Sequence, residues 1–181
     1  CILQCSFGVE AGMYKSDEVY EKVYSVEKDA LDYFMNKPNC DAVGGNLVIY
    51  ASGNDAKPTS GYPAAYHKYI SVSAIGPDYL PTTYTNYGPG CKISAPGGDI
   101  TLNSLSTGYR AQILSTVPEE LEHFGKSYGY MQGTSMACPH VSGVAALGLS
   151  YALKLGKHFE YDEFLAMLYT SVNDLEHFIE T

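Results

Sequence analysis

The chain has 181 residues, of which 45% are hydrophobic, so we expect residues 1–181 to fold as a single domain with a sizeable core. It carries 11 basic and 20 acidic residues, and this net charge of -9 argues against nucleic acid as a partner, because phosphate binding requires clustered Lys and Arg. No run of 18 apolar residues occurs, so no membrane span is expected.

The first two predicted elements are a strand and a helix. Residues 2–7 are short, largely apolar and bounded by a glycine, which indicates a buried strand. Ser16 or Asp17 can cap a helix that begins near Glu18 and ends at residues 37–39. The apolar face of this helix is predicted from residues at helical spacing, which are Val19, Val23, Val26, Ala30 and Phe34.

Three further strands follow along the chain. Residues 47–51 form an apolar run that closes on a sharp turn, and residues 69–74 are rich in β-branched side chains. Residues 91–95 form a short strand that a Pro-Gly-Gly sequence ends. Residues 98–132 lack regular periodicity, so we expect a surface excursion there, with a helical turn near residues 118–124.

Two helices are predicted to complete the chain. The apolar run that starts at residues 133–143 and continues to Leu155 predicts a helix buried on all sides. A last amphipathic helix is expected from Tyr161 to Ser171, with an apolar face formed by Phe164, Leu165 and Leu168. This order of strands and helices favours an α/β fold, a parallel sheet with helices on both faces.

Two short segments fall where a ligand site is expected. Active sites in parallel sheets form at the carboxyl ends of the strands. Residues 6–8 follow the first predicted strand and residues 53–54 follow the second. Both segments are therefore placed to meet one ligand.

Ser135 lies at the predicted start of the long helix, where unpaired N–H groups and a positive potential can stabilise a negative charge. A serine in this position is most often a plain cap, and it becomes a nucleophile only with a base and oxyanion donors beside it. Thr134 is placed to cap the helix. Gly143 and Gly148 weaken a helix, so we expect another backbone to pack close to them.

Residues 133–143 read Gly-Thr-Ser-Met-Ala-Cys-Pro-His-Val-Ser-Gly. This string resembles the serine motif of the subtilisin-like serine peptidases, or subtilases, at every position. The resemblance implies that Ser135 is the nucleophile and that Asn54 donates its side-chain amide to the oxyanion. It also implies a three-layer architecture of subtilisin type and a cis peptide bond between Tyr62 and Pro63.

The same resemblance implies two walls of a peptide-binding groove. One wall, which pairs with an extended substrate by β-augmentation, is Ser6, Phe7 and Gly8. The opposite wall, beside the residue that precedes the cleaved bond, is Ala51, Ser52 and Gly53. The implied protein is a secreted or cell-envelope endopeptidase that hydrolyses polypeptides through an acyl-enzyme. It needs no cofactor, although the resemblance allows Ca²⁺ held partly by carbonyls after Pro63.

The groups that would activate Ser135 are missing from the sequence pattern. In subtilisin the triad runs Asp, His, Ser, with about 160 residues between the His and the Ser. Here 134 residues precede Ser135 and no His-Gly-Thr segment occurs. We expect structural or surface roles for His67, His123, His140, His158 and His177. The chain is therefore expected to be the carboxyl-side portion of a catalytic domain, an incomplete fold that is inactive alone, with Asp and His on an upstream segment.

Alternatives remain open on the sequence alone. A non-catalytic subtilase-like domain could bind peptides or serve as a scaffold. An α/β-hydrolase esterase needs the order Ser, Asp, His, so Asp162 or Asp174 with His177 would have to serve, and 46 residues follow Ser135. Asp55 either forms the turn next to the site or favours a basic substrate side chain.

The five cysteines follow no metal-ligand spacing, so they predict no metal site. Cys1 and Cys5 lie four residues apart on a predicted strand, too far apart to form a disulfide. We expect all five to be buried free thiols.

Overall fold

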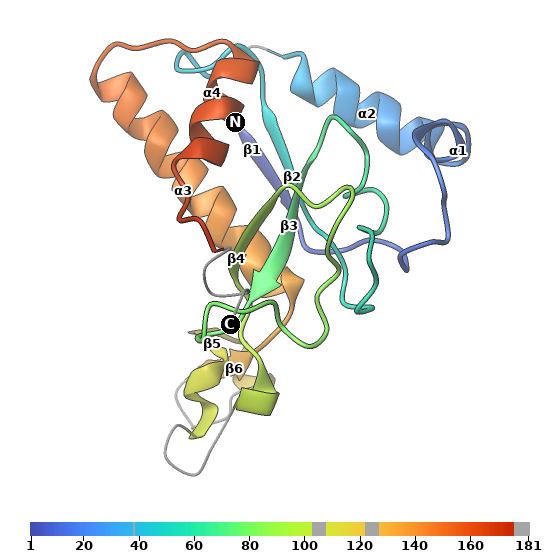
Figure 1. Cartoon of the computed structure of the whole chain (residues 1–181). Helices are drawn as coiled ribbons and strands as arrows, with labels where there is room; N and C mark the ends of the chain where they lie inside the picture. The colour runs from blue at the N-terminus through green and yellow to red at the C-terminus, as the bar shows by residue number, and fades with distance from the viewer. Residues whose placement is uncertain (38, 103–107, 122–126, 176–181) are drawn as a thin grey trace.

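The computed structural model describes all residues except 38, 103–107, 122–126 and 176–181 (Figure 1). Four parallel strands form a sheet in the order β1-β2-β3-β4. Their bounds are β1 (Ile2–Cys5), β2 (Leu47–Ala51), β3 (Ile70–Ile75) and β4 (Ile93–Pro96). The four predicted strands are confirmed, with small shifts at their ends. Because all the pairs are parallel, the four carboxyl ends lie at one edge of the sheet.

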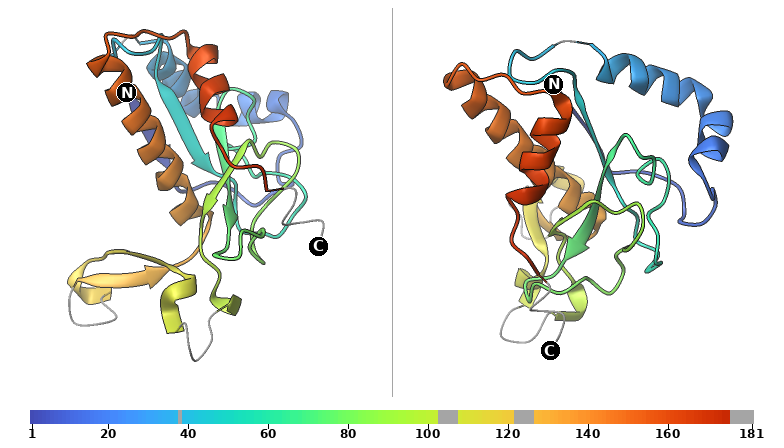
Figure 2. Two further views of the ribbon diagram at one scale, coloured as in Figure 1. Left: turned by 60° about the vertical axis from the view of Figure 1, so that its left-hand side comes forward. Right: turned by 45° about the horizontal axis from the view of Figure 1, so that its top comes forward.

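Helices cover both faces of this sheet (Figures 1 and 2). On one face lie α3 (Thr134–Lys154) and α4 (Tyr161–Thr170). On the other lie α1 (Asp17–Val23) and α2 (Ser25–Met35). The side chains of β2 alternate between the two cores: Leu47, Ile49 and Ala51 pack on the α3 side, and Val48 and Tyr50 pack on the α1 side. The predicted α/β architecture with helices on both faces is confirmed.

The edge position of β1 corrects the prediction that it is a buried strand. Within the described sheet β1 pairs with β2 alone. Cys5 is buried, Ile2 and Leu3 are half-buried, and Gln4 is exposed. An apolar run indicates a strand but does not say whether that strand has neighbours on both sides.

The predicted single helix over residues 18–36 is two helices that break at Tyr24. Ser16 caps the first of them, and its Oγ accepts a hydrogen bond from the N–H of Val19 at 3.4 Å. The predicted apolar face is wrong at Val19, Val23, Val26 and Ala30, which are exposed. It is confirmed at Phe34, which packs against the core. Tyr20 and Leu31 are the buried residues of these two helices. Tyrosines make up most of the buried core on this side, so the spacing of aliphatic residues does not mark the buried face of the two helices.

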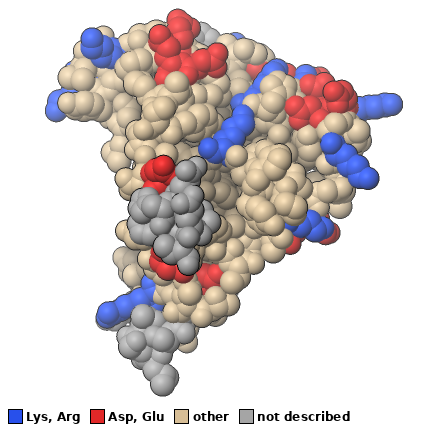
Figure 3. Space-filling model, viewed as in Figure 1, with Lys and Arg blue, Asp and Glu red and all other residues tan. Residues whose placement is uncertain are grey.

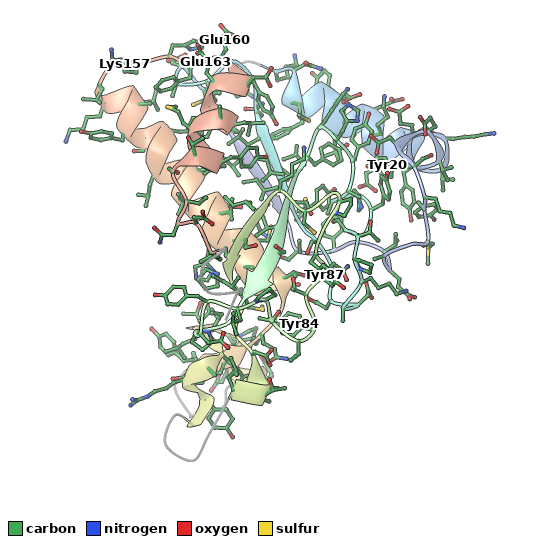
Figure 4. The ribbon with its side chains drawn as sticks, in the orientation of Figure 1. Tyr20, Tyr84, Tyr87, Lys157, Glu160 and Glu163 are labelled. Atoms are coloured by element: carbon green, nitrogen blue, oxygen red, sulfur yellow. The ribbon has the colours of Figure 1, made fainter. Side chains whose placement is uncertain are left out.

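A layer of tyrosines fills the space between α1 and the sheet. Tyr20, labelled in Figure 4, is 0% exposed and its ring stacks on that of Tyr62 at 5.2 Å between centroids. Tyr66 lies 5.1 Å from the same ring and donates its hydroxyl to the Glu21 carboxylate at 2.6 Å. The Tyr20 hydroxyl, by contrast, approaches the Tyr69 hydroxyl without hydrogen-bond geometry, and neither hydroxyl has a hydrogen-bond partner among the described residues. Tyr20 and Tyr66 therefore lie in the same layer but differ in whether the hydroxyl group has a hydrogen-bond partner.

This contrast predicts opposite effects of one chemical change. Tyr20→Phe removes a buried hydroxyl without a partner, so we expect the free energy of unfolding to rise by about 1 kcal/mol. Tyr66→Phe removes a hydrogen bond to a carboxylate, so we expect it to fall by about 1 to 2 kcal/mol. Urea unfolding of both variants checks this. Equal effects of the two substitutions would contradict the assigned difference in hydrogen bonding.

The tyrosine layer also predicts a loss of stability in alkali. Burial raises the pKa of Tyr20 to about 12, and it raises the pKa of Tyr50, Tyr62, Tyr66 and Tyr69 in the same direction. Below about pH 10 both the folded and the unfolded state hold these protons, so this contribution is fully present. Above it the unfolded state releases protons that the folded state keeps. The urea midpoint should therefore fall steeply from about pH 10 upward, and a midpoint unchanged to about pH 12 would refute this.

Helix α3 lies along the sheet and contacts all four strands. The prediction that it is buried on all sides is wrong, because Val144, Leu147 and Tyr151 are exposed. The expected close backbone at its glycines is also absent among the described residues: open space surrounds Gly143, and Gly148 meets the Phe164 ring. By length and composition alone α3 could cross a membrane. These two properties are weak evidence of a membrane span, because a core helix that packs on a sheet also has them.

The chain leaves the sheet after β4 and returns to it at the start of α3. Between these points β5 (Ile113–Thr116) and β6 (Tyr128–Met131) form an antiparallel hairpin, which extends away from the sheet in Figure 2. Short 3₁₀ turns lie at Ile100–Leu102, Gly108–Ala111 and Glu119–Leu121. The last falls within the predicted turn, whose end lies outside the described residues. The Gly133 N–H donates to the Gly97 carbonyl at 3.0 Å, so the two ends of this excursion are hydrogen-bonded to each other.

Candidate active site

A pocket of about 350 Å³ opens at the end of the sheet where the strands have their carboxyl termini. It is lined by all the site residues expected from the sequence, which are Ser6, Phe7, Gly8, Ala51, Ser52, Gly53, Asn54 and Ser135. The register of β1 and β2 pairs Cys5 with Tyr50, so the segments that follow these two strands leave the sheet side by side. The start of α3 completes the pocket.

Ser135 lies in the first turn of α3 and is half-buried. Its hydroxyl donates to the Ser6 carbonyl at 3.4 Å, a long hydrogen bond that a substrate could displace. The Ser6 hydroxyl donates in return to the Ser135 carbonyl at 2.8 Å and accepts from the Gln4 amide at 2.6 Å. Ser6 therefore lines the pocket and also links the start of α3 to the end of β1 by hydrogen bonds.

The side-chain amide of Asn54 is held in one orientation by Thr134. Its Oδ1 accepts hydrogen bonds from the N–H and from the hydroxyl of Thr134, both at 2.9 Å. These bonds assign the carbonyl end of the amide to Thr134, so the Nδ2 end is the free donor. The positive φ of this turn falls on Gly53, at 105°, and Asn54 is not among the residues with positive φ.

The role expected for Thr134 needs a correction. Gly133 is the residue that caps α3, with φ 144, and no side chain caps the helix. The Thr134 hydroxyl instead accepts from the Gly53 N–H at 3.3 Å and donates to Asn54. Its short side chain reaches the turn after β2 because the two segments meet at the same edge of the sheet.

Two unpaired donors belong to residues that line the same pocket as the Ser135 hydroxyl. The N–H of Ser135 is at the helix start, where no intrahelical partner exists, and it bonds to none of the described residues. Asn54 Nδ2 likewise has no partner in the described part of the chain. Donors of this kind stabilise the negative oxygen that develops when a hydroxyl attacks a carbonyl group.

The charged residues that line the pocket are acidic. The Glu10 carboxylate pairs with Lys57 at 2.8 Å. The Asp55 carboxylate accepts from the Ala11 N–H at 3.0 Å and from the Asn86 amide at 3.1 Å, which favours its turn-forming role over recognition of a basic side chain. On the face seen in Figure 3 basic and acidic side chains are interspersed, without a continuous basic surface among the described residues.

None of the described histidines lines the pocket. His67 Nδ1 pairs with the Asp17 carboxylate at 2.6 Å, and the Nδ1 atoms of His140 and His158 lie 2.7 and 2.8 Å from the carbonyl oxygens of Met136 and Asp41. His123 and His177 lie outside the described residues. The esterase alternative gains no support, because neither Asp162 nor Asp174 lines the pocket.

No cluster of three or more metal-binding side chains occurs among the described residues. All five cysteines are free thiols, as expected, but only Cys5 and Cys138 are buried. Cys1 is exposed, and Cys40 and Cys91 are half-buried, which corrects the expectation of burial for these three. Burial raises the pKa of the Cys138 thiol, one turn from Ser135, to about 11, so this thiol is protonated and unreactive near neutral pH.

Several lining residues were not predicted as part of the site, namely Val9, Glu10, Gly61, Tyr62 and Thr134. The peptide bond between Tyr62 and Pro63 is cis, as predicted. Asn86, which lies behind the pocket and contacts its turn, gave no signal in the sequence. Its neighbours in the sequence predict only a loop.

A model of the subtilase family matches residues 4–177. Halolysin from Haloferax mediterranei is 39% identical over 104 residues, which cover 58% of this chain and 17% of halolysin. The extracellular basic protease of Dichelobacter nodosus is 37% identical over 114 residues, which cover 62% of this chain and 17% of that protease. The chain thus spans less than a fifth of the length of each of these curated relatives.

A solved structure, that of the prenylagaramide maturation protease PagA, is similar to this fold. The TM-score is 0.58 with 26% sequence identity, and the match covers 86% of this chain and 46% of that one. The layers and the parallel sheet described above are therefore shared with a protease that is about twice as long as the matched part.

Proposed function

The chain belongs to the subtilase family, and from this premise we propose that it carries the nucleophile and the oxyanion hole of a serine endopeptidase. Ser135 Oγ attacks the carbonyl carbon of a peptide bond and gives its proton to the base, the C–N bond breaks, and the amine leaves with that proton. Water then hydrolyses the acyl-enzyme, which releases the carboxylic acid and restores the Ser135 hydroxyl. The observation that carries this proposal is the pair of unpaired donors, Ser135 N–H and Asn54 Nδ2, on the pocket that the Ser135 hydroxyl also lines.

The two strand ends form the walls of the substrate groove in this proposal. An extended polypeptide pairs with Ser6, Phe7 and Gly8 as an added strand, and the side chain before the cleaved bond enters the pocket opposite. The second wall is Ala51, Ser52 and Gly53. Secretion is part of the same proposal, and the name of the Dichelobacter nodosus relative, an extracellular protease, supports it.

The base that activates Ser135 comes, in this proposal, from a segment outside residues 1–181. The described histidines support this, because each is hydrogen-bonded away from the pocket. The order Asp, His, Ser in subtilisin places that segment upstream. Exposed apolar side chains on α3, such as Leu147 at 73%, offer a surface on which more of the catalytic domain can pack. The 181-residue chain by itself is then inactive.

Labelling with a fluorophosphonate probe tests both parts of the proposal. The probe is applied to the full-length protein that contains this chain and, separately, to the 181-residue chain, and mass spectrometry identifies the modified residue. We expect Ser135 to be labelled in the full-length protein and not in the chain alone. Absence of labelling in the full-length protein would leave the scaffold alternative, and labelling of Ser135 in the chain alone would overturn the external base.

A further inference from the structure

Asn86 lies directly behind the turn that carries Asn54, and its side chain is fully buried. It belongs to the segment after β3, where Figure 4 labels Tyr84 and Tyr87. This segment runs alongside the turn: the Ala56 N–H donates to the Tyr84 carbonyl at 2.9 Å, and the Tyr87 N–H donates to the Lys57 carbonyl at 3.0 Å. The turn after β2 therefore rests on a buried neighbour that does not itself reach the pocket.

The amide of Asn86 bonds to the chain on both sides of Asn54. Its Oδ1 accepts from the N–H groups of Asp55 and Lys57, both at 3.1 Å. Its Nδ2 donates to the Ser52 carbonyl at 2.9 Å and to the Asp55 carboxylate at 3.1 Å. Both hydrogens and both lone pairs of this amide are used, which no other side chain of the same size can reproduce.

The fit at Gly53 shows how closely the two segments match. The Asn86 backbone N–H donates to the Gly53 carbonyl at 3.1 Å. Gly53 has φ 105, and a Cβ built on it would lie 2.4 Å from Asn86 Nδ2. The backbone just before Asn54 thus has the conformation that glycine allows, and the Asn86 amide occupies the space that a side chain would need.

We propose that Asn86 is a positioning residue for the oxyanion donor, an inference that rests on the proposed role of Asn54. Thr134 holds the amide oxygen of Asn54, and Asn86 holds the backbone on both sides of it. Together they point Asn54 Nδ2 at the place where the oxyanion forms. Because such donors act through preorganised geometry, a shift of the turn weakens catalysis although no residue that touches the substrate is replaced.

Asn86→Asp in the full-length protein is the main variant, because it keeps the shape of the side chain. It replaces the two N–H donors by an oxygen that faces the Ser52 carbonyl and the Asp55 carboxylate. We expect kcat for a peptide amide substrate to fall about 10- to 100-fold, within the loss expected for removing the donor itself, and KM to stay within about threefold. Asn39→Asp, which changes the charge equally at an exposed position, should leave both unchanged.

A second background separates positioning from a general structural role. In the Asn54→Leu variant the donor is gone, so Asn86→Asp should lower kcat there by less than about twofold. A role in folding alone would lower activity by the same factor in both backgrounds. Equal factors, or a rise in KM without a fall in kcat, overturn the inference.

A measurement that does not depend on catalytic activity tests this inference separately from the proposed function. The side-chain amide signal of Asn54 in ¹⁵N NMR spectra, assigned through Asn54→Leu, should shift or broaden in Asn86→Asp when the turn loses its support. Asn86→Ser, which brings no charge, serves if Asn86→Asp does not fold. An Asn54 signal unchanged in a folded variant overturns the positioning role. If the unmodified full-length protein is inactive, the proposed function fails and the NMR result still decides the role of Asn86.

Discussion

Ser135→Ala is expected to lower kcat of the full-length protein by about 10⁶, the loss that removal of the nucleophile causes in subtilisin. The substitution removes the one atom that would form the acyl-enzyme, while the Asn54 donor and the groove remain. KM should therefore change little. The hydroxyl makes only a long hydrogen bond to the Ser6 carbonyl, at 3.4 Å, so its removal should cost little stability.

Steady-state hydrolysis of a peptide amide checks this prediction, together with burst kinetics for an ester substrate. Ser142→Ala is the matched control, since Ser142 lies on the same helix and donates to the Cys138 carbonyl at 3.1 Å, away from the lining of the pocket. It should keep full activity. A residual activity of Ser135→Ala above about one per cent of the parent would mean that another group is the nucleophile.

Asn54→Leu is expected to lower kcat by about 10² to 10³ and to leave KM nearly unchanged, as loss of the equivalent amide does in subtilisin. Leu has nearly the same shape but no donor. The donor acts only when the carbonyl oxygen becomes negative, so its loss affects the transition state more than the bound substrate. Leu also lacks the Oδ1 acceptor, so the N–H and hydroxyl of the buried Thr134 lose their partner, and we expect the variant to fold with a free energy of unfolding lower by about 1 to 3 kcal/mol.

Separate determination of kcat and KM is the essential measurement for this variant. Asn39→Leu, at an exposed position outside the pocket, is its control and should have parental constants. A rise in KM at unchanged kcat would contradict the prediction. It would show that Asn54 binds the substrate in its ground state and does not stabilise the oxyanion.

Much of the site could be predicted because its parts are carried by short stretches of sequence. The serine string marks a helix start, and the residues after the first two apolar runs follow strands that end at the same edge. Once the strands are parallel, these three stretches must approach one another. The pocket that contains both Ser135 and Asn54 follows from that geometry.

The helical layer on the other face could not be predicted in the same way. Aliphatic spacing placed Val19, Val23 and Val26 toward the core, and all three are exposed. Tyr20 is buried instead, because several tyrosine rings from distant parts of the chain pack around it. A tyrosine has an apolar ring and a polar hydroxyl, so a sequence pattern does not show whether it is buried. Its neighbours in the folded structure decide that.

By itself the sequence determined the four parallel strands with helices on both faces of their sheet, the membership of the subtilase family, and which short segments would meet at the pocket. These follow from periodicity and motif, which are local properties. The tertiary structure alone decided that Thr134 orients Asn54, that Asn86 supports the turn, and that the donors beside Ser135 remain unpaired. Such hydrogen bonds join residues 29 to 80 positions apart, so they depend on strand register and helix placement, which no window of sequence contains.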